Sequence, residues 1–371
     1  MNQYIAKTYT GLEEVLAAEL EKIHANDITI EKRAVKFKGT PKIMYRANYE
    51  CRTALKILKE LSSFHLDTAD DLYINALDIP WEKLIEPSQT FSIDHDVISE
   101  FFNNSMYASL LCKDAIVDRI RQHHGIRPNV DKDKADIQIT VFVRDQEAII
   151  YLNSSGSSLH LRAYKKYSGI APVSEVLAAG LIALSGWDPD TPFLNPMCGS
   201  GTFLIEAQRI AQNIPAQVHR KYFCFKNWPD FDEERWELVI KGAKMRILRT
   251  PPTIIGFDHH SDTLKGAKTN TLAAGSFKFT QLYNFDFFKY QPKIKKGTVI
   301  VNPPYNMRLQ IEDNMDFYRK MSRVFSEEYR GLDIWILCPH EISLKKAGFK
   351  IRKEYTVYNG PIRCRFANII V

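Results

Sequence analysis

The second half of the chain alternates short, unbroken apolar runs with segments whose apolar residues recur at helical spacing. Such runs are typical of strands buried in a parallel sheet. Asn359 and Gly360 form a strong hairpin turn near the end of the sequence. The pattern predicts an α/β domain of the doubly wound, Rossmann-like kind that closes with an antiparallel hairpin. The predicted strands are residues 193–194, 253–258, 279–285, 297–301, 333–339, 350–358 and 362–371, and the predicted helices are residues 170–184, 202–213 and 262–274.

The first 160 residues carry shorter amphipathic segments, which predict a smaller α+β unit. Ile79, Pro80 and Trp81 interrupt the pattern and predict a turn over residues 78–84. The predicted strands are residues 3–8, 28–37 (one strand or a hairpin), 90–94, 137–143 and 148–153, the last two paired as a hairpin, and the predicted helices are residues 11–24, 47–61 and 106–123.

Length and composition fit a globular protein of two or three domains, with 371 residues, 45% hydrophobic and 25% charged. No apolar run reaches membrane-spanning length, and the sequence starts with a polar stretch that does not resemble a signal peptide. We therefore expect a cytoplasmic protein with no membrane contact. The six cysteines have no regular spacing, which predicts neither a disulfide framework nor a zinc site.

Charge is distributed unevenly along the chain. Residues 1–160 hold 19 Lys and Arg against 24 Asp and Glu, whereas residues 161–371 hold 31 against 20. A polyanion is therefore attracted mainly to the second half. In the first half, Lys32 and Arg33 begin the best local basic cluster, which is a candidate RNA contact or simply a solvated face.

The segment from Asn195 to Thr202 joins an apolar run to a helix. Glycine at positions 199 and 201 lets the backbone adopt positive φ and lets a ligand approach the main chain closely. The helix start adds unpaired N–H groups and a positive dipole end, so the turn suits an anionic or carboxylate-bearing cofactor. The spacing matches neither the dinucleotide fingerprint nor a P-loop. A turn with glycines for steric reasons alone is the alternative.

This turn resembles the D-P-x-C-G-S-G-T turn of amino-methylating, S-adenosylmethionine-dependent methyltransferases. The resemblance implies S-adenosylmethionine as the cofactor. Asn195 stands where that family usually has Asp, which keeps an acceptor oxygen and loses the charge. The resemblance assigns to the cofactor the turn residues Asn195, Pro196, Cys198, Gly199, Ser200, Gly201 and Thr202.

A second motif follows the apolar run 297–301 and reads Asn302-Pro303-Pro304-Tyr305. Its two prolines fix φ twice and hold the motif rigidly at the end of the strand. An exocyclic amine of a nucleobase is a poor nucleophile, because its lone pair is delocalised into the ring. The Asn302 oxygen and the Pro303 carbonyl can accept the amine hydrogens, and Tyr305 can stack on the base. We predict that these four residues form the catalytic site.

The whole chain is similar to the THUMP-domain RNA methyltransferases, on the segments K-D-A-I-V-D (113–118), R-P-N-V-D (127–131) and L-H-L-R-A-Y (159–164). Within that family it is similar to stand-alone forms of the amino-terminal half of RlmL-type enzymes. The resemblance implies an N-terminal ferredoxin-like part (1–50), an RNA-binding THUMP domain (51–160) and a class I methyltransferase domain (161–371). It implies guanine-N2 methylation of 23S rRNA, on free RNA or on a large-subunit precursor.

Four further residues are candidates for the cofactor site. Asp258 ends a strand where an acceptor for the ribose hydroxyls belongs, and the resemblance places Asp286 at the adenine amine. Pro172 fits the first turn of a helix, and Glu175 either caps that helix or meets the cofactor's amino group. The pair His259 and His260 does not predict a metal, because adjacent imidazoles should point apart and no third ligand is near.

The junction between the halves interleaves basic and aromatic side chains, a composition typical of nucleic-acid contacts. The predicted RNA-binding residues are Arg162, Tyr164, Lys165, Lys166, Lys32 and Arg33. The segment 223–236 is aromatic and acidic, and either a lid or a packing element fits it.

The catalytic motif alone leaves the substrate open, since adenine-N6 methyltransferases of DNA or RNA and glutamine methyltransferases of release factors share it. A non-catalytic RNA-binding factor for ribosome assembly is the further alternative, motivated by Asn195.

Overall fold

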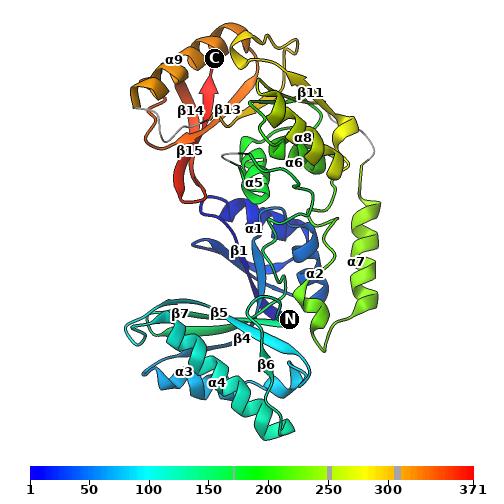
Figure 1. Cartoon of the computed structure of the whole chain (residues 1–371), viewed down its shortest axis with the longest axis vertical. Coiled ribbons are helices and arrows are strands. Elements are labelled where there is room, and N and C mark those ends of the chain that lie inside the picture. Colours follow the sequence, from blue (N-terminus) through cyan, green and yellow to red (C-terminus); the bar gives the residue numbers. More distant parts are fainter. Residues whose placement is uncertain (170–171, 249–252, 305–310) are drawn as a thin grey trace.

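The computed structural model describes residues 1–169, 172–248, 253–304 and 311–371. Two sheets lie at opposite ends of an elongated molecule, with α1 and α2 between them (Figure 1). Helix α7 (Glu233–Met245) runs along one side of this middle region. Within the described ranges, no helix is both long and apolar enough to cross a membrane.

The first sheet has eight strands in the order β2-β3-β1-β4-β8-β7-β5-β6. Its strands are β1 Asn2–Lys7, β2 Asn26–Glu31, β3 Ala34–Gly39, β4 Lys56–His65, β5 Thr90–Ile98, β6 Asn129–Val130, β7 Ile137–Arg144 and β8 Glu147–Asn153. Its helices are α1 Glu13–Lys22, α2 Pro41–Glu50, α3 Asp70–Asp78 and α4 Ser105–His124, with a short 3-10 turn η1 at Trp81–Lys83. Because β4 pairs with β1 on one side and with β8 on the other, one continuous sheet spans this half. The predicted division at residue 50 remains a prediction.

The predicted helix over residues 47–61 is wrong. Helix α2 already ends at Glu50, and the following segment forms strand β4. Pro41 occupies the first turn of α2, where its missing N–H costs nothing. Lys, Leu and Glu favour a helix in β4, but hydrogen bonding to a strand on each side outweighs that propensity. Helix α3 was also missed, because only Leu72 and Ala76 mark its buried face.

The second sheet has seven strands in the order β11-β10-β9-β12-β13-β15-β14, of which the first five are parallel. Strand β15 pairs antiparallel with both β13 and β14. The predicted Rossmann-like α/β fold with a C-terminal hairpin is therefore confirmed. The strands are β9 Phe193–Pro196, β10 Ile254–Asp258, β11 Thr280–Asn284, β12 Thr298–Val301, β13 Asp333–Pro339, β14 Lys350–Asn359 and β15 Ile362–Ile370. The helices are α5 Glu175–Ser185, α6 Thr202–Ala211, α8 Ser261–Ala273 and α9 Ile311–Glu328, with 3-10 turns η2 Cys224–Asn227, η3 Phe277–Phe279 and η4 Phe287–Lys289.

Each face of this sheet is covered by its own helices. On one face, Phe193 and Ile300 lie in a core cluster with Leu177 of α5 and Leu204 of α6. On the other face, α9 supplies Tyr318, Met321 and Phe325 to a separate cluster. Since successive residues of a strand point to opposite faces, the continuous apolar runs are explained by burial on both sides.

The two halves are docked tightly onto each other. Leu12 precedes α1, yet it is fully buried in the core of the second half. A Cβ at Gly180 of α5 would lie 2.5 Å from the Leu12 side chain, so glycine is needed there. Gly11 has φ +89°, and a Cβ there would lie 2.5 Å from the carbonyl oxygen of Thr356 in β14. These close contacts fix α1 against α5 and against the C-terminal hairpin.

The segment 223–236 is a packing element. Phe223, Phe225 and Trp236 are buried in the core cluster of the first half. Tyr45 of α2 packs on Phe225 at a centroid distance of 4.7 Å and on Trp236 at 5.9 Å. An aromatic cluster of this size stabilises the junction, so of the two alternatives the packing one holds.

Candidate functional site

The glycine turn adopts the backbone that its sequence predicts. Met197, Gly199 and Gly201 have φ values of 53°, 55° and 79°. The Cys198 N–H donates to the Phe257 carbonyl at 3.0 Å, which ties the turn to β10, and α6 begins directly at Thr202. A Cβ at Gly199 would meet no heavy atom within 4 Å, so this backbone is open to a ligand. Gly201 instead faces Ala267 of α8 at 3.3 Å and serves helix packing.

Other residues of this turn have structural partners. Cys198 is buried, and burial raises the pKa of its thiol well above the ordinary value. Ser200 and Thr202 are buried, with their hydroxyl oxygens 3.3 Å apart. The Ser200 carbonyl accepts a hydrogen bond from the Asn270 amide of α8 at 2.9 Å. The turn is thus held from α8 on one side and from β10 on the other.

Asp258 lies at the carboxyl end of β10, beside the turn. Its side chain is 7% exposed and accepts hydrogen bonds from the Gly199 N–H at 3.1 Å and from the His260 N–H at 3.0 Å. The Asn284 amide at the end of β11 donates to the Asp258 carbonyl at 3.0 Å. Asp286 follows and is half-buried, and its carboxylate caps η4 by accepting from the Phe288 N–H at 3.0 Å. Both carboxylates therefore lie at the same sheet edge as the turn.

The two adjacent histidines do not point apart as expected. The ring centroids of His259 and His260 are 3.7 Å apart, because neighbouring rings in this loop can stack. Across the part of the chain that the structure describes, no group of three His, Cys, Asp or Glu side chains could hold a metal ion.

Asn195 is buried at the end of β9, next to β12. Its amide nitrogen donates to the Ile300 carbonyl at 2.7 Å, while its oxygen is buried without a partner in the described structure. An ionised carboxylate at this position could not donate to Ile300. The free amide oxygen fits an acceptor for the ammonium group of a cofactor at the turn, so the residues present fit S-adenosylmethionine.

Asn302 directly follows β12 at the same edge of the sheet. Its side-chain oxygen is also buried and has no partner among the described residues. Pro303 is buried and Pro304 is exposed, while Tyr305 lies outside the described residues. A buried acceptor without a partner costs about 1–3 kcal/mol, and a hydrogen-bonding substrate would offset this cost. The motif thus presents one of its two predicted acceptors in usable form.

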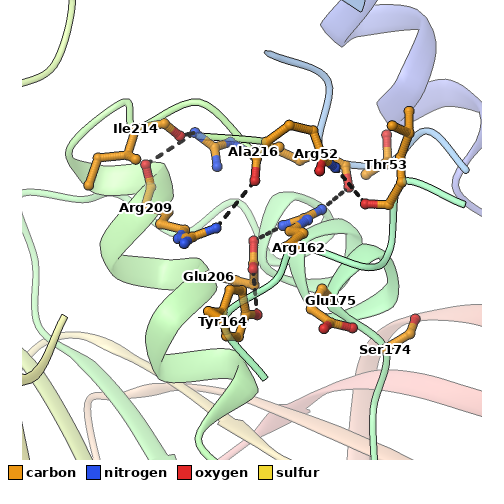
Figure 2. A network of polar contacts seen from close by, with 12 residues as sticks. Arg52, Thr53, Arg162, Tyr164, Ser174, Glu175, Glu206, Arg209, Ile214 and Ala216 are labelled. Atoms are coloured by element: carbon orange, nitrogen blue, oxygen red, sulfur yellow. Dashed lines mark hydrogen bonds and ion pairs between the residues drawn. The ribbon is translucent and has the colours of Figure 1, made fainter. Parts of the chain in front are cut away.

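Arg162 and Tyr164 are buried, and the prediction that they bind RNA is corrected for both. Arg162 forms an ion pair with Glu206 of α6 and donates to the Arg52 carbonyl (Figure 2). The Tyr164 hydroxyl donates to the other Glu206 oxygen at 2.7 Å. The sequence pattern is misleading here because a segment that crosses between two halves can bury the same side chains that a surface would expose.

Arg52 and Arg209 complete this buried network, and sequence reasoning missed both of them, along with Glu206. Arg52 donates to the carbonyls of Arg209 at 3.1 Å and Ile214 at 2.6 Å. The Arg209 guanidinium lies 4.6 Å from the centroid of the Tyr164 ring. Burial lowers the pKa of Arg52 to about 10. The network links the first half to α6, whose N-terminus carries the glycine turn (Figure 2).

The other predicted RNA contacts differ in their exposure. Lys165 is half-buried, and its ammonium donates to the Val173 carbonyl at 3.1 Å, so its predicted RNA contact is not supported. Lys166 is exposed, while its backbone N–H donates to Asn270. Lys32 and Arg33 are exposed in the turn between β2 and β3. These last three remain predictions.

Helix α5 begins later than expected. Its N-cap is Ser174, whose hydroxyl accepts from the Leu177 N–H at 3.1 Å, so Glu175 is not the cap. Pro172 is exposed and precedes the helix, which contradicts its predicted place in the first turn. Glu175 is 3% exposed, and burial raises the pKa of its carboxyl group. Its contact with the cofactor remains a prediction.

Comparison with protein families gives three matches along the chain. Residues 162–368 match the methyltransferase domain described as RMKL-like. Residues 67–153 match the THUMP domain, and residues 3–58 match the RlmL ferredoxin-like domain. The methyltransferase match alone covers more than half of the chain.

Three solved structures match almost the whole chain at 26% identity. SMU.472, a candidate methyltransferase complexed with SAH, has a TM-score of 0.90 over 99% of this chain and 97% of that chain. A possible methylase from Clostridium difficile 630 has a TM-score of 0.91 over 99% and 97%. A predicted N6-adenine-specific DNA methylase from Listeria monocytogenes str. 4b F2365 has a TM-score of 0.89 over 99% and 95%. The chain therefore belongs to the RMKL-like methyltransferases, in the form that carries THUMP and RlmL ferredoxin-like domains, and its cofactor is S-adenosylmethionine.

Proposed function

We propose that this protein methylates the N2 amine of a guanine in 23S rRNA. The observation that carries the proposal is the buried, unpartnered oxygen of Asn302, at the sheet edge that also holds the glycine turn. An acceptor in this state is suited to an amine hydrogen of a base that has left its stack. The matches to a THUMP domain and to the RlmL ferredoxin-like domain support RNA of the large ribosomal subunit as the substrate.

The residues of the edge divide the work of binding and orientation. S-adenosylmethionine supplies an electrophilic methyl group. The open backbone at Gly199 and the carboxylates of Asp258 and Asp286 would hold the cofactor. Asn302 and the Pro303 carbonyl would accept the two amine hydrogens and so direct the nitrogen lone pair toward the methyl group. Tyr305 is expected to stack on the base and keep it in line.

Adenine N6 is the second candidate target, because an N6-adenine-specific methylase is among the similar structures by its description. Both bases carry an exocyclic amine with two hydrogens, and the Asn302 motif can accept either. A non-catalytic RNA-binding factor is the third candidate. The buried, free oxygens of Asn195 and Asn302 count against it, since a binding factor gains nothing from unpaired acceptors.

Product analysis distinguishes the three candidates. We expect the purified protein to transfer a radiolabelled methyl group from S-adenosylmethionine to 23S rRNA that lacks its modifications, and nucleoside digestion should give N2-methylguanosine. N6-methyladenosine as the product would favour the second candidate. Cofactor binding without any transfer to naked RNA or to precursor particles would favour the third.

Replacement of Asp258 by alanine should weaken S-adenosylmethionine binding at least about tenfold, because a charge-assisted hydrogen bond is worth about 1.5–3 kcal/mol. The change also releases the Gly199 N–H, which now donates to Asp258 at 3.1 Å. Isothermal calorimetry measures the affinity. The matched control is Asp262→Ala, four residues further on, whose carboxylate side chain is 88% exposed. Equal affinities for the wild type and Asp258→Ala would contradict the assignment.

Replacement of Asn195 by aspartate should not improve cofactor binding by more than a few-fold. The amide oxygen already accepts, whereas a carboxylate would face the Ile300 carbonyl without a hydrogen to donate. We also expect a loss of about 1–3 kcal/mol in the free energy of unfolding. Calorimetry and urea unfolding test both effects, with the exposed Asn103→Asp as the control. A hundredfold gain in affinity would show that the natural site is impaired.

A further inference from the structure

A cavity of about 680 Å³ lies between η4 and helix α9. Its lining is half aromatic or aliphatic and half charged, and consists of Phe288, Phe317, Val324, Lys320, Arg323 and Asp316. None of these residues belongs to the cofactor site or to the catalytic motif. The family matches and the predicted RNA contacts leave this cavity without a role.

The cavity adjoins the catalytic edge of the sheet. Its residue Phe288 donates its backbone N–H to the Asp286 carboxylate at 3.0 Å. The neighbouring Phe287 packs on Phe325 of α9 at a centroid distance of 5.1 Å, which holds η4 against the helix. Helix α9 is also the element that follows the Asn302 motif in the chain. A strand of nucleic acid with one base at Asn302 can therefore continue over this cavity.

Two aromatic rings form the cavity wall. Phe288 and Phe317 meet edge to face, with ring centroids 5.4 Å apart and planes at 88°. Both side chains are only half-buried, so each keeps ring surface open to a ligand. Bases stack on such surfaces with about 1–3 kcal/mol per base and with little preference for sequence.

The charge of the cavity is positive. Lys320 and Arg323 are exposed on one face of α9, and neither has an ion pair within the described part of the chain. The one acid of the lining, Asp316, is paired with Arg319 at 2.6 Å. The connection from η4 to β12 adds exposed lysines that likewise have no ion pair among the described residues: Lys289, Lys293, Lys295 and Lys296.

We propose that this cavity binds a single-stranded nucleotide of the RNA substrate next to the target base, with its base on Phe317 and Phe288 and its phosphate on Lys320 and Arg323. The inference rests on the proposed function, because it assumes that the substrate is RNA. Extraction of a base from its stack costs a few kcal/mol, and binding of the neighbouring strand offsets this cost. Aromatic surface beside unpaired cations fits a nucleic acid better than it fits an acidic peptide, which has no bases to stack.

The test uses the double variant Lys320→Ala/Arg323→Ala of the full chain. We expect KM for 23S rRNA to rise about tenfold with unchanged kcat, since phosphate contacts contribute equally to the ground state and the transition state. The slope of log affinity against log salt for a short single-stranded RNA should fall by about 1.4, or 0.7 for each lost phosphate contact. The control is Lys241→Ala/Lys244→Ala, which removes two exposed lysines from α7. S-adenosylmethionine affinity should match the wild type in both double variants.

A third variant, Phe317→Leu, keeps apolar bulk and removes the stacking surface. We expect weaker binding of the short RNA with an unchanged salt slope, because no charge is lost. An unchanged KM, RNA affinity and salt slope in the α9 double variant would overturn the inference. So would an equal effect of the α7 control, or a loss of binding to an acidic peptide that exceeds the loss of RNA binding. Failure of the wild type to methylate any RNA would instead overturn the proposed function, and direct RNA binding would still decide the role of the cavity.

Discussion

Replacement of Asn302 by alanine is expected to lower kcat for methyl transfer about 100- to 1,000-fold, with little change in the affinity for S-adenosylmethionine or RNA. Removal of one preorganised hydrogen-bonding group that acts on the developing charge has an effect of this size in other enzymes. The Asn302 oxygen is buried and free of protein partners, so its loss removes an interaction made chiefly as the amine becomes nucleophilic. Single-turnover transfer to 23S rRNA measures the rate, and calorimetry measures cofactor affinity.

Asn103→Ala is the matched control, because that asparagine is exposed in the first half and far from the motif in sequence. It should retain the wild-type rate. Full activity of Asn302→Ala would refute the proposed role of the motif. A parallel loss of cofactor affinity and rate would point to a disrupted cofactor site, since a transition-state contact leaves ground-state binding nearly intact.

The fold of the second half could be predicted from the sequence because its strands are buried on both faces. Continuous apolar runs such as 297–301 and 333–339 leave few alternatives to a parallel sheet. The cofactor turn was equally predictable, since Gly199 and Gly201 adopt the positive φ that only glycine takes easily. Chemistry and backbone conformation depend here on the same local residues.

The first half was harder to predict, and strand β4 shows why. Its residues favour a helix locally, and only the pairing with β1 and β8, far away in the sequence, makes them a strand. Long-range pairing of this kind leaves no periodic signal in a half-buried strand. The same limitation hid α3, whose buried face rests on two side chains.

The candidate site was predictable up to its edges. Asp258, Asp286 and Asn302 each follow a strand, so the rule that parallel strands end at one edge brings them together. The junction residues Arg162 and Tyr164 could not be placed in the same way. Their charge and aromatic character fit a surface and a buried network equally well, and only the position of Glu206 on α6 decides between the two.

Replacement of Glu206 by alanine is expected to lower the free energy of unfolding by about 3–5 kcal/mol, the range for a buried ion pair that loses one partner. Glu206 is fully buried, and both of its oxygens are used, one by Arg162 and one by Tyr164. The variant leaves the Arg162 guanidinium buried without its counter-charge. Urea-induced unfolding, followed by tryptophan fluorescence, measures the loss.

Glu237→Ala on the exposed face of α7 is the control and should change stability by less than about 0.5 kcal/mol. Glu206→Gln keeps the shape and one acceptor oxygen, so its loss should lie between those of the alanine variant and the control. A loss below about 1 kcal/mol in Glu206→Ala would show that the network is not held by its charges. Because Arg52 and Leu12 of the first half also enter the core of the second, the same reasoning predicts that the catalytic half cannot be separated without exposing this network. The variants must therefore be compared in the full chain, where changes in methyl transfer and changes in folding can be measured on one molecule.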